Sequence, residues 1–219
     1  KLLKNSTILS SPGLFSIFFS IISIPIHLNI AGAENYGNYV IFHFILIISL
    51  ILNFGIGKSI AVSINNYPKK NKEIAYEGIK YTFFIIGILI FIFYFFSSID
   101  KTLLPSSLIK NSLFNFVICG FVISVIYSSL EGVLQGNYKF ISLSLCNFIF
   151  FSLSLSLPSI SLFFDESLTL ENLIFFSLLI KLITVSIMFL IIYKNGLIKK
   201  SNSKILFINL KKNSRWLTL

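Results

Sequence analysis

Six long apolar runs dominate this sequence, and short polar segments separate them. Each run is close to the roughly 20 residues that an α-helix needs to cross a bilayer. The apolar residues are consecutive, whereas the strands of a membrane barrel alternate between apolar and polar positions. We therefore predict an all-α, polytopic membrane protein. Its six transmembrane helices are expected at residues 13–30, 39–60, 81–96, 113–130, 141–164 and 173–193.

The composition excludes a soluble globular enzyme domain. Of the 219 residues, 55% are hydrophobic and only 12% are charged, against roughly 25% charged residues in soluble domains. We expect residues 1–200 to form one six-helix bundle, and residues 201–219 to be a basic cytoplasmic linker with the start of a seventh helix. The chain begins with Lys1, and its one methionine is Met188, so we expect it to be a fragment of a longer protein.

Positive charges are distributed unevenly among the segments between the runs. Fifteen of the 18 Lys and Arg residues lie before the first run, around the segment between the second and third, between the fourth and fifth, or after the sixth. Lys and Arg are retained on the cytoplasmic side, so we predict a cytoplasmic N-terminus. Topology and attraction to anionic membrane lipids then explain the net charge of +10, with no need for a nucleic-acid partner.

Polar side chains recur at helical spacing in three of the runs. The stripes are Ser16, Ser20, Ser23 and His27 in the first run, Ser124, Tyr127, Ser128, Glu131 and Gln135 in and after the fourth, and Ser177, Lys181 and Thr184 in the sixth. In lipid, such faces are expected to turn toward the protein interior or a wet cavity. Close helix packing and a solvated cavity both fit this pattern.

Lys181 is the most informative single residue, because it lies within the sixth run. An ammonium near the centre of a bilayer costs about 2.5–3.5 kcal/mol on insertion scales, so something must offset it. A substrate phosphate, an ion pair with Glu131 or another acid, and snorkelling of the side chain toward an interface are three explanations.

Other candidate chemistry is sparse. Lys58 follows Gly57 and precedes Ser59, but a phosphate-binding loop needs a glycine where this chain has Leu52. Lys58 is therefore either an interfacial lysine or a ligand for an anionic head group that enters from the cytoplasm. His27 and His43 could carry protons, although two lone histidines are more often packing residues.

No catalytic or metal site is predicted. Cys119 and Cys146 both lie inside apolar runs, without the paired Cys or His spacing of a zinc site. The acidic residues are scattered through short loops and form no paired-carboxylate site. We expect neither an enzyme nor a cofactor.

Four short motifs stand beside the predicted helices. Residues 32–37 read Gly-Ala-Glu-Asn-Tyr-Gly, residues 53–57 read Asn-Phe-Gly-Ile-Gly, residues 131–136 read Glu-Gly-Val-Leu-Gln-Gly, and Arg215 precedes Trp216. In order and spacing they resemble elements of the O-antigen and polysaccharide flippases, which belong to the multidrug/oligosaccharidyl-lipid/polysaccharide exporter superfamily. The resemblance covers essentially the whole chain. Asn53 departs from it, because related chains often carry an acid there.

The resemblance implies the N-terminal bundle of a MATE-like transporter with two six-helix bundles around a central cavity. It also implies a bacterial inner-membrane flippase that moves undecaprenyl-diphosphate-linked oligosaccharide repeat units from the inner to the outer leaflet. Its partners would be the lipid-linked substrate, membrane lipids, the missing C-terminal half, a polysaccharide polymerase and chain-length machinery. The candidate cavity residues are Lys181, Lys58, Glu131, Gln135, His27 and Asn53.

Two other functions remain open at this stage. A multidrug and toxin extruder of the same superfamily should expose acidic residues inside its helices to bind cations, whereas the clearest charge within a run here is that of Lys181. An oligosaccharide polymerase should carry arginines or histidines on a sizeable outer loop, and the longest outer loop expected here covers only residues 97–112.

Overall fold

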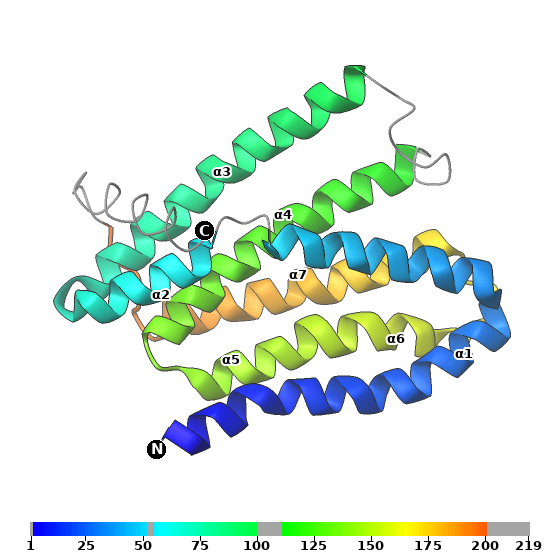
Figure 1. Ribbon diagram of the computed structural model, residues 1–219, viewed down its shortest axis with the longest axis horizontal. Helices are drawn as coiled ribbons and strands as arrows, with labels where there is room; N and C mark the ends of the chain where they lie inside the picture. Colours follow the sequence, from blue (N-terminus) through cyan, green and yellow to red (C-terminus); the bar gives the residue numbers. More distant parts are fainter. Residues whose placement is uncertain (1, 52–54, 100–110, 201–219) are drawn as a thin grey trace. The chain divides into compact units, whose positions relative to one another are not determined.

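The computed structural model describes residues 2–51, 55–99 and 111–200 (Figure 1). The described chain forms helices joined by turns and short irregular segments and contains no strand, which confirms the all-α prediction. The elements are α1 (Leu2–Ile51), α2 (Ile56–Asn66), the short 3-10 helix η1 (Pro68–Lys70), α3 (Asn71–Ile99), α4 (Asn111–Gly136), α5 (Phe140–Asn147), the π-helical η2 (Phe148–Leu153), α6 (Ser154–Ser161) and α7 (Leu170–Lys194).

Five helical segments of the described chain are long and apolar enough to cross a membrane. They are Leu14–Ile48, Pro68–Phe91, Leu113–Gly136, Phe140–Ser161 and Leu170–Lys194. The first contains most of the first two predicted spans, and the end of the second predicted span falls in α2 instead. Residues 201–219, where the linker and seventh helix were predicted, lie outside the described part.

The α1 helix is a hairpin of two arms. Gly32 interrupts its helical geometry with φ 82° and ψ 164°, and Figure 1 shows the chain reversing direction in this region. A positive φ of this size is easily adopted only by glycine, because a Cβ would meet the neighbouring carbonyl oxygen. The first arm therefore comes from the predicted span at residues 13–30, and the second arm from the start of the span at residues 39–60.

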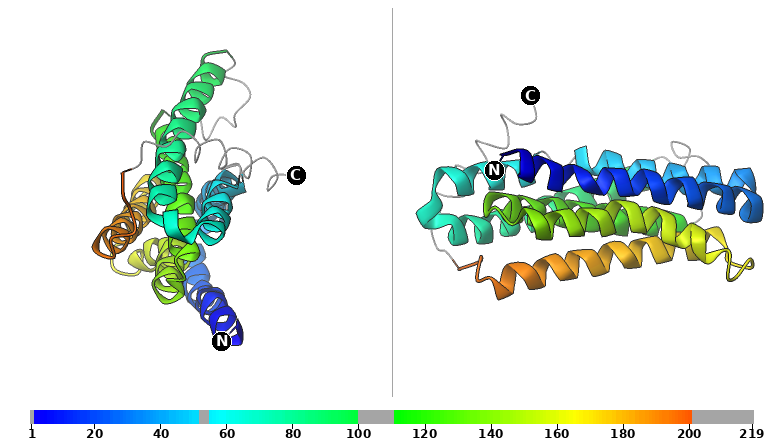
Figure 2. Two further views of the ribbon diagram at one scale, coloured as in Figure 1. Left: turned by 90° about the vertical axis from the view of Figure 1, so that its left-hand side faces the viewer. Right: turned by 90° about the horizontal axis from the view of Figure 1, so that it is seen from below.

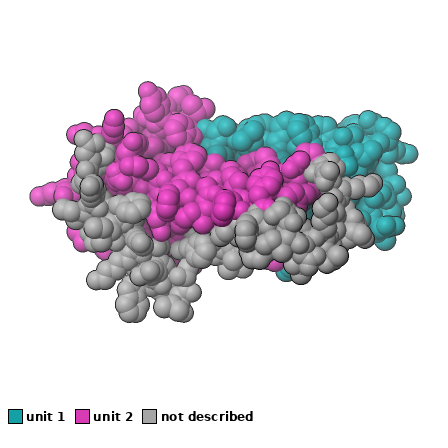
Figure 3. Space-filling view, turned by 90° about the horizontal axis from the view of Figure 1, so that it is seen from above, with its two compact units in different colours: residues 1–47, 140–188 teal, residues 48–139, 189–219 magenta. Residues whose placement is uncertain are grey.

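The described chain divides into two compact units, which Figure 3 shows in different colours. Unit 1 comprises Lys1–Ile47 and Phe140–Met188, and unit 2 comprises Ile48–Lys139 and Phe189–Leu219. Unit 1 thus holds both arms of α1, the composite helix α5–η2–α6, and most of α7. Figures 1 and 2 agree in placing the composite helix between the first arm of α1 and α7.

Unit 2 is built on α2, α3 and α4, which pack against one another. Between α3 and α4, Ile86 meets Phe121 and Val125 in a buried cluster. The opposite side of α3 exposes Phe84, Ile88 and Phe91. Apolar exposure therefore extends along the side of α3 that faces away from α4.

Candidate functional site

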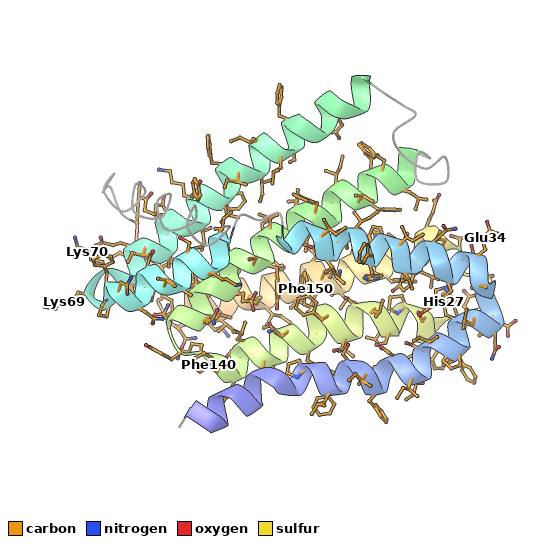
Figure 4. All side chains as sticks on the ribbon, viewed as in Figure 1. His27, Glu34, Lys69, Lys70, Phe140 and Phe150 are labelled. Atoms are coloured by element: carbon orange, nitrogen blue, oxygen red, sulfur yellow. The ribbon has the colours of Figure 1, made fainter. Side chains whose placement is uncertain are left out.

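Unit 1 buries a group of polar side chains among its helices. We call it the polar core and define it as His27, Tyr39, His43, Ser159, Ser177 and Lys181, all of which are less than 10% exposed. The first three come from the two arms of α1, Ser159 comes from α6, and the last two come from α7. Figure 4 labels His27 and also Phe150, which lies beside Lys181. All of these residues belong to one compact unit.

His27 joins the first arm of α1 to α6. Its Nδ1 atom lies 2.9 Å from the hydroxyl oxygen of Ser159, and its ring contacts those of Tyr36 and Tyr39, with centroids 5.2 Å apart in each case. The side chain is fully buried, and its Nε2 atom has no hydrogen-bond partner among the described residues. Because a buried polar atom without a partner is costly, His27 has capacity to bind a further polar group.

The Tyr39 hydroxyl bonds to a backbone carbonyl oxygen that Pro158 leaves free. Pro158 has no N–H, so it leaves the carbonyl oxygen of Ser154 without its usual helical donor. The Tyr39 hydroxyl lies 3.2 Å from that oxygen and 3.0 Å from the carbonyl oxygen of Leu155. A side-chain hydrogen bond thereby joins the second arm of α1 to α6.

His43 and Ser177 connect the second arm of α1 to α7. The Nε2 atom of His43 lies 3.2 Å from the Ser177 hydroxyl, and the His43 ring contacts Tyr39 at a centroid distance of 4.7 Å. Lys181 follows Ser177 by about one helical turn of α7 and is also buried. The contacts of unit 1 therefore form a continuous series from His27 through Tyr39 and His43 to Ser177, one helical turn before Lys181.

Lys181 is 5% exposed, so its side chain lies among the helices of unit 1 and not on their surface. Its Nζ atom lies 5.2 Å from the ring centroid of Phe150, a cation–π contact. No carboxylate in the described part of unit 1 forms an ion pair with it, since Glu34, Asp165, Glu166 and Glu171 are all exposed. A buried ammonium whose contact among the described residues is an aromatic ring can attract an anion.

The remaining predicted site residues lie elsewhere. Lys58, Glu131 and Gln135 belong to unit 2, where Lys58 and Gln135 are exposed and Glu131 is half-buried. Glu131 has other interactions. Asn53 lies outside the described residues. The structure therefore gathers His27 and Lys181 in one unit and places the other described candidates in the second.

Two of the sequence motifs meet in unit 2 as a close helix contact. A Cβ on Gly132 would overlap the backbone carbonyl of Gly57, and a Cβ on Gly57 would overlap the carbonyl oxygen of Ser128. Ser128, Gly132 and Gly136 follow one another at four-residue intervals along α4, the spacing that brings helix backbones close together in membranes. The motif at 131–136 thus packs α4 onto α2, in addition to ending the helix.

Sequence reasoning missed Tyr39 and Ser159 and treated His43 as a packing residue. One signal was available for Tyr39, because Pro158 inside a predicted membrane helix frees a carbonyl that some donor must satisfy. The sequence does not identify the residue that supplies this donor, since Tyr39 and Ser154 are 115 positions apart. Among the described residues, no cluster of three or more His, Cys, Asp or Glu side chains could hold a metal ion.

Comparisons with known proteins identify the fold. No family model matches the sequence, and no curated protein matches it significantly. One similar solved structure is an outward-facing conformation of a multidrug resistance MATE family transporter of the MOP superfamily. It is 14% identical with a TM-score of 0.67, and the match covers 96% of this chain and 52% of that one.

A second similar structure is a MOP superfamily transporter from Pyrococcus furiosus, for which a binding pocket of reverse polarity suggests a different function. It is 15% identical with a TM-score of 0.66, and the match covers 96% of this chain and 51% of that one. The chain spans about half the length of either transporter. It is a multi-pass helical membrane protein with the fold of about half of a MATE transporter.

Proposed function

We propose that this chain is half of a flippase that moves undecaprenyl-diphosphate-linked oligosaccharide repeat units from the inner to the outer leaflet of a bacterial inner membrane. The observation that carries the proposal is the buried Lys181 ammonium, which has no carboxylate partner in the described part of unit 1. An ammonium is a strong donor to phosphate oxygens, and its hydrogen bonds to anions are stronger than those between neutral groups.

The neighbouring groups of the polar core suit the same cargo. The free Nε2 atom of His27 offers one more polar contact to a ligand. Tyr39 and Ser177 already have partners, so we assign them the role of holding the helices in place. Transport would proceed by alternating access between this bundle and a second one, with no covalent step.

A multidrug exporter is the second candidate, and a specific residue favours it. Glu77 on α3 is 5% exposed and lies within Pro68–Phe91, a helical segment long and apolar enough to cross a membrane, where a cation exporter would need an acid. One structural neighbour is a multidrug resistance transporter, and the other has a pocket of reverse polarity. The fold is therefore compatible with cargo of either charge, and a functional test has to decide.

The test is complementation by the full-length gene in two bacterial strains. The first lacks its own polysaccharide flippase and is scored for surface polysaccharide, and the second lacks its drug exporters and is scored for drug resistance. The variants are Lys181→Ala, Lys181→Arg and Glu77→Gln, and Lys199→Ala is the control because Lys199 is exposed and outside the spans.

We expect the wild-type gene and Lys199→Ala to restore surface polysaccharide. Lys181→Ala should lose at least about 90% of it at an unchanged protein level, because one charged hydrogen bond to a ligand is worth about 1.5–3 kcal/mol. Lys181→Arg should keep part of the activity because it retains the charge. Drug resistance that depends on Glu77, without restored polysaccharide, would contradict the flippase and support the exporter.

A further inference from the structure

Four helix ends of unit 2 meet at a surface rich in lysine. The α2, α4 and α7 helices end there and α3 begins there. We call this surface the lysine platform, and it consists of Lys69, Lys70, Lys72, Lys139, Lys194, Lys199 and Lys200. Figure 4 labels Lys69 and Lys70 at the turn between α2 and α3. All seven lysines belong to unit 2, and none belongs to the polar core.

Three direct hydrogen bonds fasten the loops of the platform to one another. The side-chain amide nitrogen of Asn71 donates to the side-chain oxygen of Asn137 at 3.0 Å. This bond joins the start of α3 to the end of α4. The Lys139 ammonium donates to the Asn195 side-chain oxygen at 3.1 Å. The Lys199 backbone N–H donates to the carbonyl oxygen of Lys72 at 3.1 Å, so the lysines form one surface.

Backbone N–H groups supply hydrogen bonds to the last turns of three helices at the platform. The last carbonyls of α2, α4 and α7 accept backbone N–H groups, from Tyr67 to Ser63, from Lys139 to Leu134, and from Leu197 to Ile192. None of the seven lysines forms an ion pair with a carboxylate in the described part of the chain, and all except the half-buried Lys139 are exposed. Apart from that of Lys139, which donates to Asn195, their ammonium groups are therefore available to an external anion.

Exposed tyrosines indicate where this surface lies in the membrane. Tyr67, Tyr138 and Tyr193 stand beside the platform lysines in sequence, and each is about half exposed or more. Tyrosine is enriched at the boundary between hydrocarbon and water, where its ring is apolar and its hydroxyl meets the head groups. A positive surface with tyrosines at this depth matches the phosphates of lipid head groups better than it matches a soluble anion.

We propose that the lysine platform is a binding site for the head groups of anionic phospholipids in the leaflet that it faces. Because three separate loops contribute to it, a bound phosphate would join the turn between α2 and α3 to the segment that follows α7. The lipid acts here as a ligand that holds the ends of the helices and is not the transported cargo. This inference is independent of the proposed flippase activity.

The test measures lipid binding to the full-length protein in detergent. The probe is short-chain phosphatidylglycerol, with short-chain phosphatidylcholine as the neutral comparison, and binding is followed by native mass spectrometry at fixed ionic strength. The first variant is Lys69→Gln with Lys70→Gln, and the second is Lys199→Gln with Lys200→Gln. The control is Lys80→Gln, an exposed lysine of unit 2 outside the platform.

Either platform variant should weaken phosphatidylglycerol binding by at least about tenfold, since each lysine near an anionic surface contributes about fivefold. The control and the binding of phosphatidylcholine should change less than about threefold. Arginine at the same pairs should preserve binding, which separates loss of charge from misfolding. Equal weakening in the control, or no preference for phosphatidylglycerol over phosphatidylcholine, would overturn the proposal.

Discussion

The two units of this protein bury small and polar side chains for different physical reasons. In unit 1, two of the buried serines bond to histidines on other helices, Ser159 to His27 and Ser177 to His43. In unit 2, Ser124 bonds to a carbonyl of its own helix, and Gly132 lets α4 touch the backbone of α2. A stripe of small or polar residues at helical spacing can therefore indicate either of two structures in a membrane helix, a polar core or a close backbone contact.

This contrast indicates which unit tolerates change and in what respect. A close backbone contact has no room for added atoms, so unit 2 should lose stability when the glycines at this contact are replaced by larger residues. Burial of a polar or charged group is unfavourable unless the group has a hydrogen-bond or ion-pair partner. Parts of unit 1 should therefore gain stability when groups without such a partner are removed. Each prediction below tests one side of the comparison.

The largest effect is expected at the contact between α2 and α4. Gly132→Ala would place a Cβ against the backbone of Gly57, which cannot move as a flexible side chain can. We expect a loss of about 3 kcal/mol in stability, measured as a lower midpoint of thermal unfolding for the purified protein.

Gly87→Ala on α3 is the matched control for this prediction. Nothing lies within 4 Å of the position where its Cβ would be, and alanine is favoured over glycine in a helix by about 0.5–1 kcal/mol. This control should leave the unfolding midpoint unchanged or raise it. Equal destabilisation by the two variants would show that the contact between α2 and α4 is not close.

The second effect is in unit 1 and has the opposite sign. Lys181→Met keeps a similar volume and removes a buried ammonium with no carboxylate partner in the described part of its unit. We expect stability to rise by about 2 kcal/mol, in line with the insertion cost of a central lysine, while transport falls. Thermal unfolding and transport are measured on the same samples. A variant that is less stable than wild type would identify Lys181 as a structural residue.

The structural features behind these two predictions could be predicted only in part from the sequence. The stripe of Ser177, Lys181 and Thr184 was expected to turn inward, and all three are buried, because helical spacing alone fixes which residues share a face. The all-α class followed in the same way from the length of the apolar runs. Properties of single helices were therefore readable.

Contacts between helices were not readable. Gly57 and Gly132 are 75 positions apart and belong to two separate motifs, yet they pack against each other. Which helix faces which is decided by the whole set of packing contacts, and no local pattern contains that information. The site roles of Lys58, Glu131, Gln135 and Asn53 stay predictions.

A smaller effect is expected at Tyr39. Tyr39→Phe keeps the buried ring and removes the hydroxyl that reaches the Ser154 carbonyl freed by Pro158. An unsatisfied buried acceptor costs about 1–3 kcal/mol, so we expect a loss of about 1 kcal/mol by thermal unfolding. Tyr193→Phe is the control, because Tyr193 is largely exposed. If both variants unfold at the wild-type temperature, water or a rearranged helix must satisfy the carbonyl.

The smallest effect on stability is expected at an exposed polar pair, which shows how much burial matters. In the loop between α6 and α7, the Asp165 carboxylate accepts hydrogen bonds from the side chain and the backbone N–H of Ser167, and these lower the pKa of Asp165. Ser167→Ala should raise that pKa toward its ordinary value, which NMR titration of the carboxyl carbon can follow.

A depressed carboxyl pKa stabilises the fold above the unfolded-state pKa, and this contribution disappears as the pH falls through the folded-state value. Because Asp165 is fully exposed, solvent screens the interaction, and unfolding at neutral pH should change far less than in Tyr39→Phe. An equal change in the two variants would mean that burial does not set the strength of the polar contacts in unit 1.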